Sequence, residues 1–310
     1  MRIMFMGTPG FAIPSLRILL EHDHTIVSVV TVPDKPRGRG QEIAFSPVKE
    51  FALDRKLPVL QPTNLKDPGF VSAVRALRAD LIVVVAFRIL PKEVFSLPSQ
   101  GTFNLHASLL PRYRGAAPIN WAIMNGETET GVTTFFLQEK VDTGSIILQA
   151  RVKIGPDETA GELHDKLAEV GAEIVLQTVR LIELGKANTR GQDDNRASLA
   201  PKIFKDDCRI DWGNPSLRVH NFVRGLSPHP CAWTTHGGRV LRIYRTQLPH
   251  IDALVQKPPG SVVEVTKRSL RISTGDQTIA IAELQLEGKK RMGIEEFLRG
   301  YPLEEGERLT

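Results

Sequence analysis

The chain has 310 residues, 41% hydrophobic and 24% charged, a composition typical of a globular protein long enough for two domains. No run approaches the roughly 18 apolar residues that cross a bilayer, and the turn Gly7 to Gly10 interrupts the region where a signal peptide needs an apolar stretch. Cys208 and Cys231 are the only cysteines and form no Cys-x-x-Cys pair, so the sequence can build neither a disulfide framework nor a thiolate zinc site. We therefore expect a cytoplasmic protein with no membrane association and no metal. The net charge of +5 favours a polyanionic partner without identifying one.

Short apolar strands alternate with helices in the first part of the chain. Strands are predicted over residues 2–6, 25–32, 80–86, 102–106, 131–138 and 145–152. Helices are predicted after the glycine turn, from Ser46 to about residue 56, and over 70–78. Such alternation predicts a parallel sheet covered on both faces, which is an α/β fold. A long helix follows, opened by a capping box of Thr159 and Glu162 and ended by Gly185.

Beyond this helix the alternation of strands and helices ends, and short β-rich segments follow a polar stretch. We assign residues 1–186 to a first domain, the polar stretch 187–207 to a linker, and 208–310 to a second domain. Short strands predicted over 240–244, 260–265, 270–273 and 278–286 indicate a small barrel or sandwich. The stretch 209–291 has thirteen Lys or Arg against six Asp or Glu, which suits a polyanion but equally suits a solvated surface.

The glycine turn after the first strand lacks the G-x-G-x-x-G spacing with which a backbone approaches a pyrophosphate, which disfavours a nicotinamide dehydrogenase. More informative are Asn104 and His106, two apart at the end of a strand and hence on one face. Asn could donate to a developing oxyanion and His could exchange a proton, with Asp142 orienting the imidazole. Composition alone leaves a structural pair and a catalytic pair equally open.

Longer motifs resolve this choice by resemblance. Asn104, His106, the run Ser108-Leu-Leu-Pro111, Tyr113-Arg-Gly115 and Val141-Asp-Thr-Gly144 together resemble the signature of folate-dependent formyltransferases. Within that superfamily the resemblance to the methionyl-tRNA formyltransferase family covers nearly the whole chain. It includes the Gly-Thr-Pro opening, Pro33-Asp-Lys-Pro-Arg-Gly-Arg-Gly40, Ser46-Pro-Val-Lys49, Gly115-Ala-Ala-Pro-Ile119, Glu129-Thr-Gly-Val132, Ile210-Asp-Trp212 and Gly288-Lys-Lys290.

The resemblance implies a Rossmann-like catalytic domain with a mostly parallel sheet, followed by a small OB-like β-barrel that binds tRNA. It implies that Asn104, His106 and Asp142 form the catalytic set. It implies a folate site that includes Ser108, Leu109, Leu110 and Pro111, and contacts to the initiator tRNA from Lys35, Arg37 and Arg39. Without the resemblance, that basic stretch would be read as a solvated loop.

We therefore expect a monomeric enzyme of translation initiation, which transfers the formyl group of 10-formyltetrahydrofolate to the α-amino group of methionyl-initiator tRNA. One alternative is a folate-dependent formyltransferase acting on an amino sugar nucleotide, and another is a non-enzymatic RNA-binding protein. Two departures from the family pattern stand out. The loop 85–91 is one residue shorter than expected, which bears on the shape of the pterin pocket, and Ala107 stands where Gly is frequent.

Overall fold

The computed structural model describes residues 1–37, 42–248 and 257–310. Its contacts divide the chain into two compact units, each built from several segments. The first unit contains residues 1–115, 131–152 and 164–199, and the second contains 116–130, 153–163 and 200–310. The domain boundaries that the sequence places at 186 and 208 stay predictions.

The first unit is built on a seven-stranded sheet in the order β5-β2-β1-β6-β7-β8-β9. Its strands are β1 Arg2–Gly7, β2 Thr25–Val30, β5 Val59–Leu60, β6 Leu81–Val85, β7 Thr102–His106, β8 Glu129–Phe136 and β9 Ile146–Lys153. Neighbours from β5 to β7 are parallel, whereas β8 runs antiparallel to β7. The predicted mostly parallel α/β sheet is confirmed.

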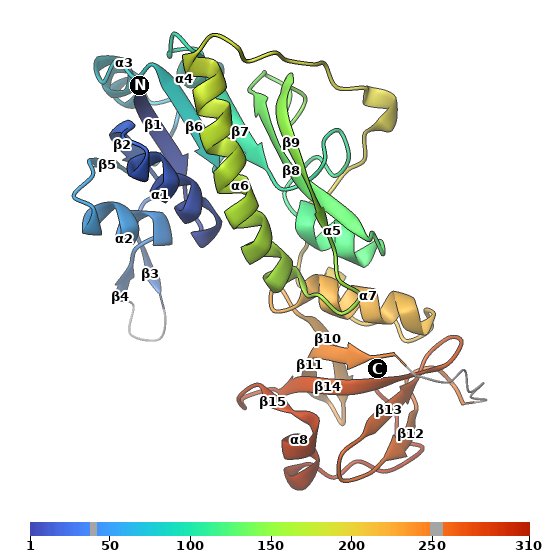
Figure 1. Ribbon diagram of the computed structural model, residues 1–310. Coiled ribbons are helices and arrows are strands. Elements are labelled where there is room, and N and C mark those ends of the chain that lie inside the picture. The colour runs from blue at the N-terminus through green and yellow to red at the C-terminus, as the bar shows by residue number, and fades with distance from the viewer. Residues whose placement is uncertain (38–41, 249–256) are drawn as a thin grey trace. The chain divides into compact units, whose positions relative to one another are not determined.

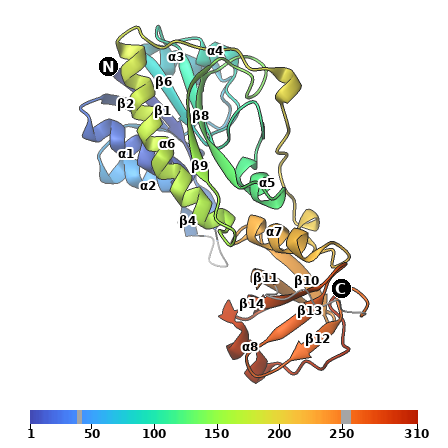
Figure 2. The same cartoon turned by 45° about the vertical axis from the view of Figure 1, so that its right-hand side comes forward.

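Helices cover both faces of this sheet, as expected for strands that are apolar on both sides. They are α1 Ile13–Glu21, preceded by a 3-10 turn over Gly10–Ala12, α2 Pro47–Asp54, α3 Pro68–Ala76, α4 Lys92–Phe95 and α6 Ala160–Glu183. Met4 and Met6 of β1 pack in one core cluster with Phe70 of α3. In both views α6 lies along the sheet (Figures 1 and 2). Gly171 of α6 lies over Leu105 of β7, whose Cδ2 would be 2.7 Å from an added Cβ.

Predicted helix caps account for the starts of two helices. The Ser46 hydroxyl accepts a hydrogen bond from the backbone N–H of Lys49 at 3.1 Å and so caps α2. At the start of α6, a Glu162 carboxylate oxygen accepts from the Thr159 N–H at 2.8 Å, and the Thr159 hydroxyl accepts from the Glu162 N–H at 3.3 Å. This reciprocal pair is the capping box expected from the sequence.

An antiparallel sheet dominates the second unit, in the order β10-β11-β14-β13-β12, with β15 paired to β14. The strands are β10 Ala232–His236, β11 Arg239–Gln247, β12 Val262–Val265, β13 Leu270–Ser273, β14 Thr278–Leu286 and β15 Met292–Gly293. The C-terminal segment bonds to both edges: Thr310 exchanges backbone hydrogen bonds with Thr235 of β10, and the Glu307 carbonyl oxygen accepts from the N–H of Val262 of β12 at 2.8 Å. The result is the predicted small barrel-like domain.

Five further helical elements complete the described chain. They are α5 Pro118–Met124, α7 Ser216–Leu226, α8 Ile294–Gly300 and 3-10 turns over Asp194–Arg196 and Asp206–Cys208. Trp212 belongs to the core of the second unit, and its indole N–H donates to the Thr234 hydroxyl at 3.1 Å. The indole of Trp212 therefore packs in the core while its N–H has a buried partner.

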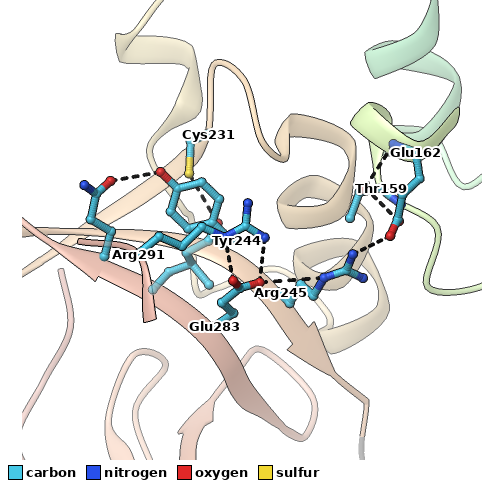
Figure 3. Close-up of polar contacts among 9 residues, drawn as sticks. Thr159, Glu162, Cys231, Tyr244, Arg245, Glu283 and Arg291 are labelled. Atoms are coloured by element: carbon cyan, nitrogen blue, oxygen red, sulfur yellow. Dashed lines mark hydrogen bonds and ion pairs between the residues drawn. The ribbon is translucent and has the colours of Figure 1, made fainter. Parts of the chain in front are cut away.

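A chain of ion pairs links the barrel to the segment that caps α6, all within the second unit (Figure 3). Arg291 donates two hydrogen bonds of 2.6 Å to the Glu283 carboxylate. The Arg245 guanidinium lies 3.7 Å from that carboxylate and also donates to Glu162. The capping carboxylate of Glu162 is thereby held from two sides.

Candidate active site

Asn104 and His106 lie at the C-terminal end of β7, where the sequence analysis places them. Because strand residues two apart share a face, both side chains point to the side opposite Leu105. Asn104 is partly exposed, and no hydrogen bond to its side-chain amide occurs in the described part of the chain. His106 is 6% exposed. The pair thus combines a free amide with a firmly held imidazole.

The imidazole of His106 lies between two oxygen atoms. Its Nε2 is 2.8 Å from the carbonyl oxygen of Tyr113, to which it can donate a hydrogen bond. Its Nδ1 is 3.9 Å from Oδ2 of Asp142, within ion-pair reach but too long for a hydrogen bond. The same Oδ2 accepts from the backbone N–H of Gly115 at 3.0 Å. The structure therefore brings together His106 and Asp142, which are distant in sequence.

Strained backbone surrounds this pair. Tyr113 and Asp142 have φ angles of 59° and 54°, a region that bulky residues rarely adopt and that Asp tolerates better. Gly144 comes so close to β8 that an added Cβ would lie 1.6 Å from the carbonyl oxygen of Phe136. Only glycine fits there, which explains the glycine of the Val141-Asp-Thr-Gly144 motif. Such strain is typical of functional sites, where the surrounding structure holds it in place.

A second layer of side chains holds the turn that carries Asp142, and sequence reasoning missed it. The side-chain amide of Gln192 donates to the carbonyl oxygens of Asp142 and Gly144, both at 2.9 Å. Its oxygen accepts from Arg114 at 3.0 and 2.7 Å, and Arg114 also donates to Asp194 at 2.8 Å. Gln192 lies in the polar stretch that the sequence analysis treats as a linker, where no motif marks it.

The predicted folate segment, Ser108 to Pro111, follows β7 directly. Ser108 is fully buried, and its hydroxyl donates to the carbonyl oxygen of Arg112 at 2.6 Å. Leu110 is also buried, with its N–H donating to Thr133 at 3.1 Å. Leu109 and Pro111 are partly exposed. Ser108 and Leu110 therefore hold the loop, and Leu109 and Pro111 are the members that can contact a ligand.

The basic stretch predicted to contact tRNA starts as a short hairpin of β3 Lys35–Arg37 and β4 Glu42–Ala44. Lys35 is exposed, and Lys35 pairs with Ala44 across the hairpin. Arg37 lies at the last position of β3, opposite Glu42. Arg39 lies outside the described residues.

A cavity of about 1250 Å³ lies in the second unit and not at these residues. Residues of α7 and β11 line it, among them His220, whose pKa is lowered chiefly by burial. Asn104, His106 and Asp142 are absent from its lining. The candidate site therefore rests on the chemistry of its side chains and not on cavity size.

No cluster of three metal-ligating side chains and no helix able to span a membrane occurs in residues 1–37, 42–248 and 257–310.

The partly exposed amide of Asn104 offers hydrogen-bond donors beside a buried imidazole that faces a carboxylate. Such donors stabilise an oxyanion that forms when a nucleophile attacks a carbonyl carbon. The imidazole and carboxylate can hold or move the proton that the nucleophile releases. The geometry thus suits acyl-type transfer without a covalent enzyme intermediate.

Comparison with known proteins identifies the chemistry. Residues 1–179 match the formyl transferase family model, and residues 202–302 match the model of the formyl transferase C-terminal domain. A methionyl-tRNA formyltransferase of Bacteroides thetaiotaomicron is 48% identical over 100% of this chain and 98% of its own length.

Solved structures share the fold. HypX from Aquifex aeolicus, in complex with tetrahydrofolic acid, superimposes with a TM-score of 0.67 at 20% identity, over 100% of this chain and 50% of that chain. WlaRD, a sugar 3N-formyl transferase, superimposes with a TM-score of 0.65 at 22% identity, over 94% of this chain and 99% of that one. The two family models and the nearly full-length relative show that this chain belongs to the formyl transferase family, among the methionyl-tRNA formyltransferases.

Proposed function

We propose that this protein transfers the formyl group of 10-formyltetrahydrofolate to the α-amino group of methionyl-initiator tRNA, giving the N-formylmethionyl-tRNA used in translation initiation. The observation that carries the proposal is the meeting of His106 and Asp142 beside the free amide of Asn104. Support for the acceptor comes from the methionyl-tRNA formyltransferase that is 48% identical over the whole chain.

The reaction begins when the neutral α-amino group attacks the formyl carbon. A carbon–nitrogen bond forms, and the electron pair of the carbonyl moves to oxygen, which becomes an oxyanion. Collapse of this tetrahedral intermediate breaks the bond between the formyl carbon and N10 of the folate. The proton lost by the attacking nitrogen ends on N10, so the products are the formylated amine and tetrahydrofolate.

Asn104 is the direct donor to the oxyanion in this scheme, because its amide has no protein partner among the described residues. His106 becomes a second donor if its Nε2–H exchanges the Tyr113 carbonyl, 2.8 Å away, for the substrate oxygen. Asp142 then orients the ring through Nδ1 and stabilises it when it carries a proton. At 3.9 Å this contact is longer than a hydrogen bond, and catalytic contacts of this kind commonly shorten when substrate binds.

The folate fits the exposed parts of the loop after β7. Leu109 and Pro111 offer apolar contacts to the flat pterin, while Ser108 and Leu110 keep the loop in shape. On the acceptor side, Lys35, Arg37 and Arg39 supply positive charge for tRNA phosphates, together with the basic second unit. Binding of tRNA is then steeply dependent on salt, because each phosphate contact releases counterions. We place the enzyme in the cytoplasm, acting as a monomer and without a metal.

An acceptor comparison tests the proposal. The protein is incubated with labelled 10-formyltetrahydrofolate and either methionyl-initiator tRNA or a dTDP-linked amino sugar. Formyl label should enter the tRNA alone. Label in the sugar nucleotide would favour the sugar formyltransferase alternative, whose fold is shared and does not discriminate. Binding of tRNA with no transfer to either acceptor would favour a non-enzymatic RNA-binding protein.

A further inference from the structure

The β3–β4 hairpin forms a two-stranded sheet separate from the main sheet of the first unit. Within the described residues, backbone pairing joins Lys35 to Ala44, Pro36 to Ile43 and Arg37 to Glu42. A two-stranded hairpin of this length is marginally stable in isolation. Contacts at its base must therefore fix its direction.

One contact at the base is a cluster around Asp34, the residue just before β3. The Asp34 carboxylate receives the Lys49 ammonium at 2.5 Å on one oxygen and the Gln61 amide at 2.8 Å on the other. Gln61 also donates to the carbonyl oxygen of Val32 at 2.8 Å. These hydrogen bonds, with that from Lys49 the larger influence, lower the pKa of the Asp34 carboxyl. Asp34 is thus tied to α2 and to the end of β5.

A second, buried contact joins the two ends of the hairpin segment. The hydroxyl groups of Thr31 and Ser46 are hydrogen-bonded at 2.7 Å and buried. Both ties join residues fifteen apart in the chain, one residue on the strand side of the hairpin and one at the start of α2. The two ends of the segment that carries the hairpin are therefore held next to each other by these two contacts.

The ammonium group of Lys49 is already paired with Asp34 and is not available to bind a ligand. Its side chain is 12% exposed, its ammonium is paired with Asp34, and it lies 4.0 Å above the Phe45 ring. Lys35, by contrast, is exposed on the hairpin. A cation so enclosed acts through the backbone that it holds and not by contacting a phosphate.

We infer that Asp34, Lys49 and Gln61 form a positioning cluster that presents the β3–β4 hairpin to the acceptor tRNA. This rests on the proposed function, since it assigns tRNA as the partner of the hairpin. Fixing the hairpin beforehand spares the ordering that binding would otherwise require. Lys49 and Asp34 are positioning residues, and their loss affects tRNA binding without touching the reacting atoms.

Single substitutions at both ends of the ion pair test the inference. K49M and D34A should each raise KM for methionyl-tRNA about fivefold, with kcat within about twofold, because a partly buried pair is worth roughly this factor. K49R should restore most of the affinity. If charge alone mattered, K49M would weaken binding and D34A would strengthen it, and this opposite response would overturn the inference. K66M, at an exposed lysine, is the matched control and should leave KM unchanged.

A double-mutant cycle separates positioning from direct contact. The variant K35A/R37A/R39A removes the three basic side chains proposed to contact tRNA, and adding K49M to it should raise KM less than about twofold further. A full multiplicative effect would show that Lys49 binds tRNA by itself, and the inference would fail. Unchanged KM for 10-formyltetrahydrofolate and an unchanged melting temperature in K49M exclude misfolding. If K35A/R37A/R39A left KM for tRNA unaltered, the inference would be wrong, while formylation by the unmodified enzyme would still support the proposed function.

Discussion

The structure predicts that Gln192, remote from the reacting atoms, controls turnover by holding the Asp142 turn. Its amide nitrogen donates to the carbonyl oxygens of Asp142 and Gly144, each at 2.9 Å. The variant Q192E removes both donors and sets a carboxylate oxygen against two carbonyls. It keeps the oxygen that accepts from Arg114. The substitution therefore removes both contacts to the turn, while Arg114 keeps an acceptor that now carries a negative charge.

The size of the effect follows from the bonds lost. Two neutral hydrogen bonds are worth about 2 kcal/mol together, and this corresponds to roughly thirtyfold in an equilibrium. If the turn leaves its place to that extent, Asp142 no longer faces His106 in most molecules. We expect kcat to fall about ten- to thirtyfold, with KM for both substrates within about twofold, because a misplaced orienting group acts mainly on the transition state.

Steady-state formylation of methionyl-tRNA measures this effect. Q100E is the control, since Gln100 is exposed and lies before β7. In a D142N background, Q192E should add less than about twofold, because the group that it positions is already neutralised. Wild-type kcat in folded Q192E would refute the reasoning.

Two further predictions concern stability. Burial opposes the ionisation of Glu162, but hydrogen bonds from Thr159 and Arg245 outweigh it and lower its pKa from 4.5 to about 2. The charged form thus stabilises the fold above about pH 4.5, and this contribution is lost as pH falls toward about 2. The free energy of unfolding of E162Q, measured in urea, should therefore depend less on pH in that window than that of the wild type. Equal dependence would contradict the assignment. G144A should lower the unfolding free energy by about 2 kcal/mol or more, since its Cβ would lie 1.6 Å from the Phe136 carbonyl oxygen, and an unchanged urea midpoint would show that the turn relaxes freely.

The sequence predicts the strands and caps well because their signals are local. The ranges 102–106, 270–273 and 278–286 agree with β7, β13 and β14 to the residue. Apolar runs and alternation reflect burial on sheet faces, and a capping box uses residues three apart. Each of these patterns is complete within a short window.

The sequence does not predict helix α7, and the reason is physical. Its buried positions include polar residues, which hide the apolar period on which helix prediction depends. Arg224 is 6% exposed and donates to the carbonyl oxygens of Gly155 and Glu158, and His220 bonds to Thr246. Those partners are distant in sequence, so no local pattern could reveal that these polar groups would be satisfied in the interior.

In the candidate site, too, some residues are predicted from the sequence and one is not. Asn104 and His106 are two apart on one strand, so their common face follows from the period of a strand. Asp142 is predicted from the Val141-Asp-Thr-Gly144 motif, and the structure shows that its Oδ2 lies 3.9 Å from Nδ1 of His106. Gln192 is fifty residues from the carbonyl that it binds, in a polar stretch without periodicity. Only the folded chain shows that this residue supports the turn.

The most direct test of the account is single-turnover formyl transfer by N104A. With saturating methionyl-tRNA and 10-formyltetrahydrofolate, the chemical step should slow about a hundredfold or more, while both substrates bind as to the wild type, because the amide acts on the oxyanion alone. A transfer rate near that of the wild type, in a folded variant, would show that the oxyanion forms elsewhere and that the end of β7 is not the catalytic centre.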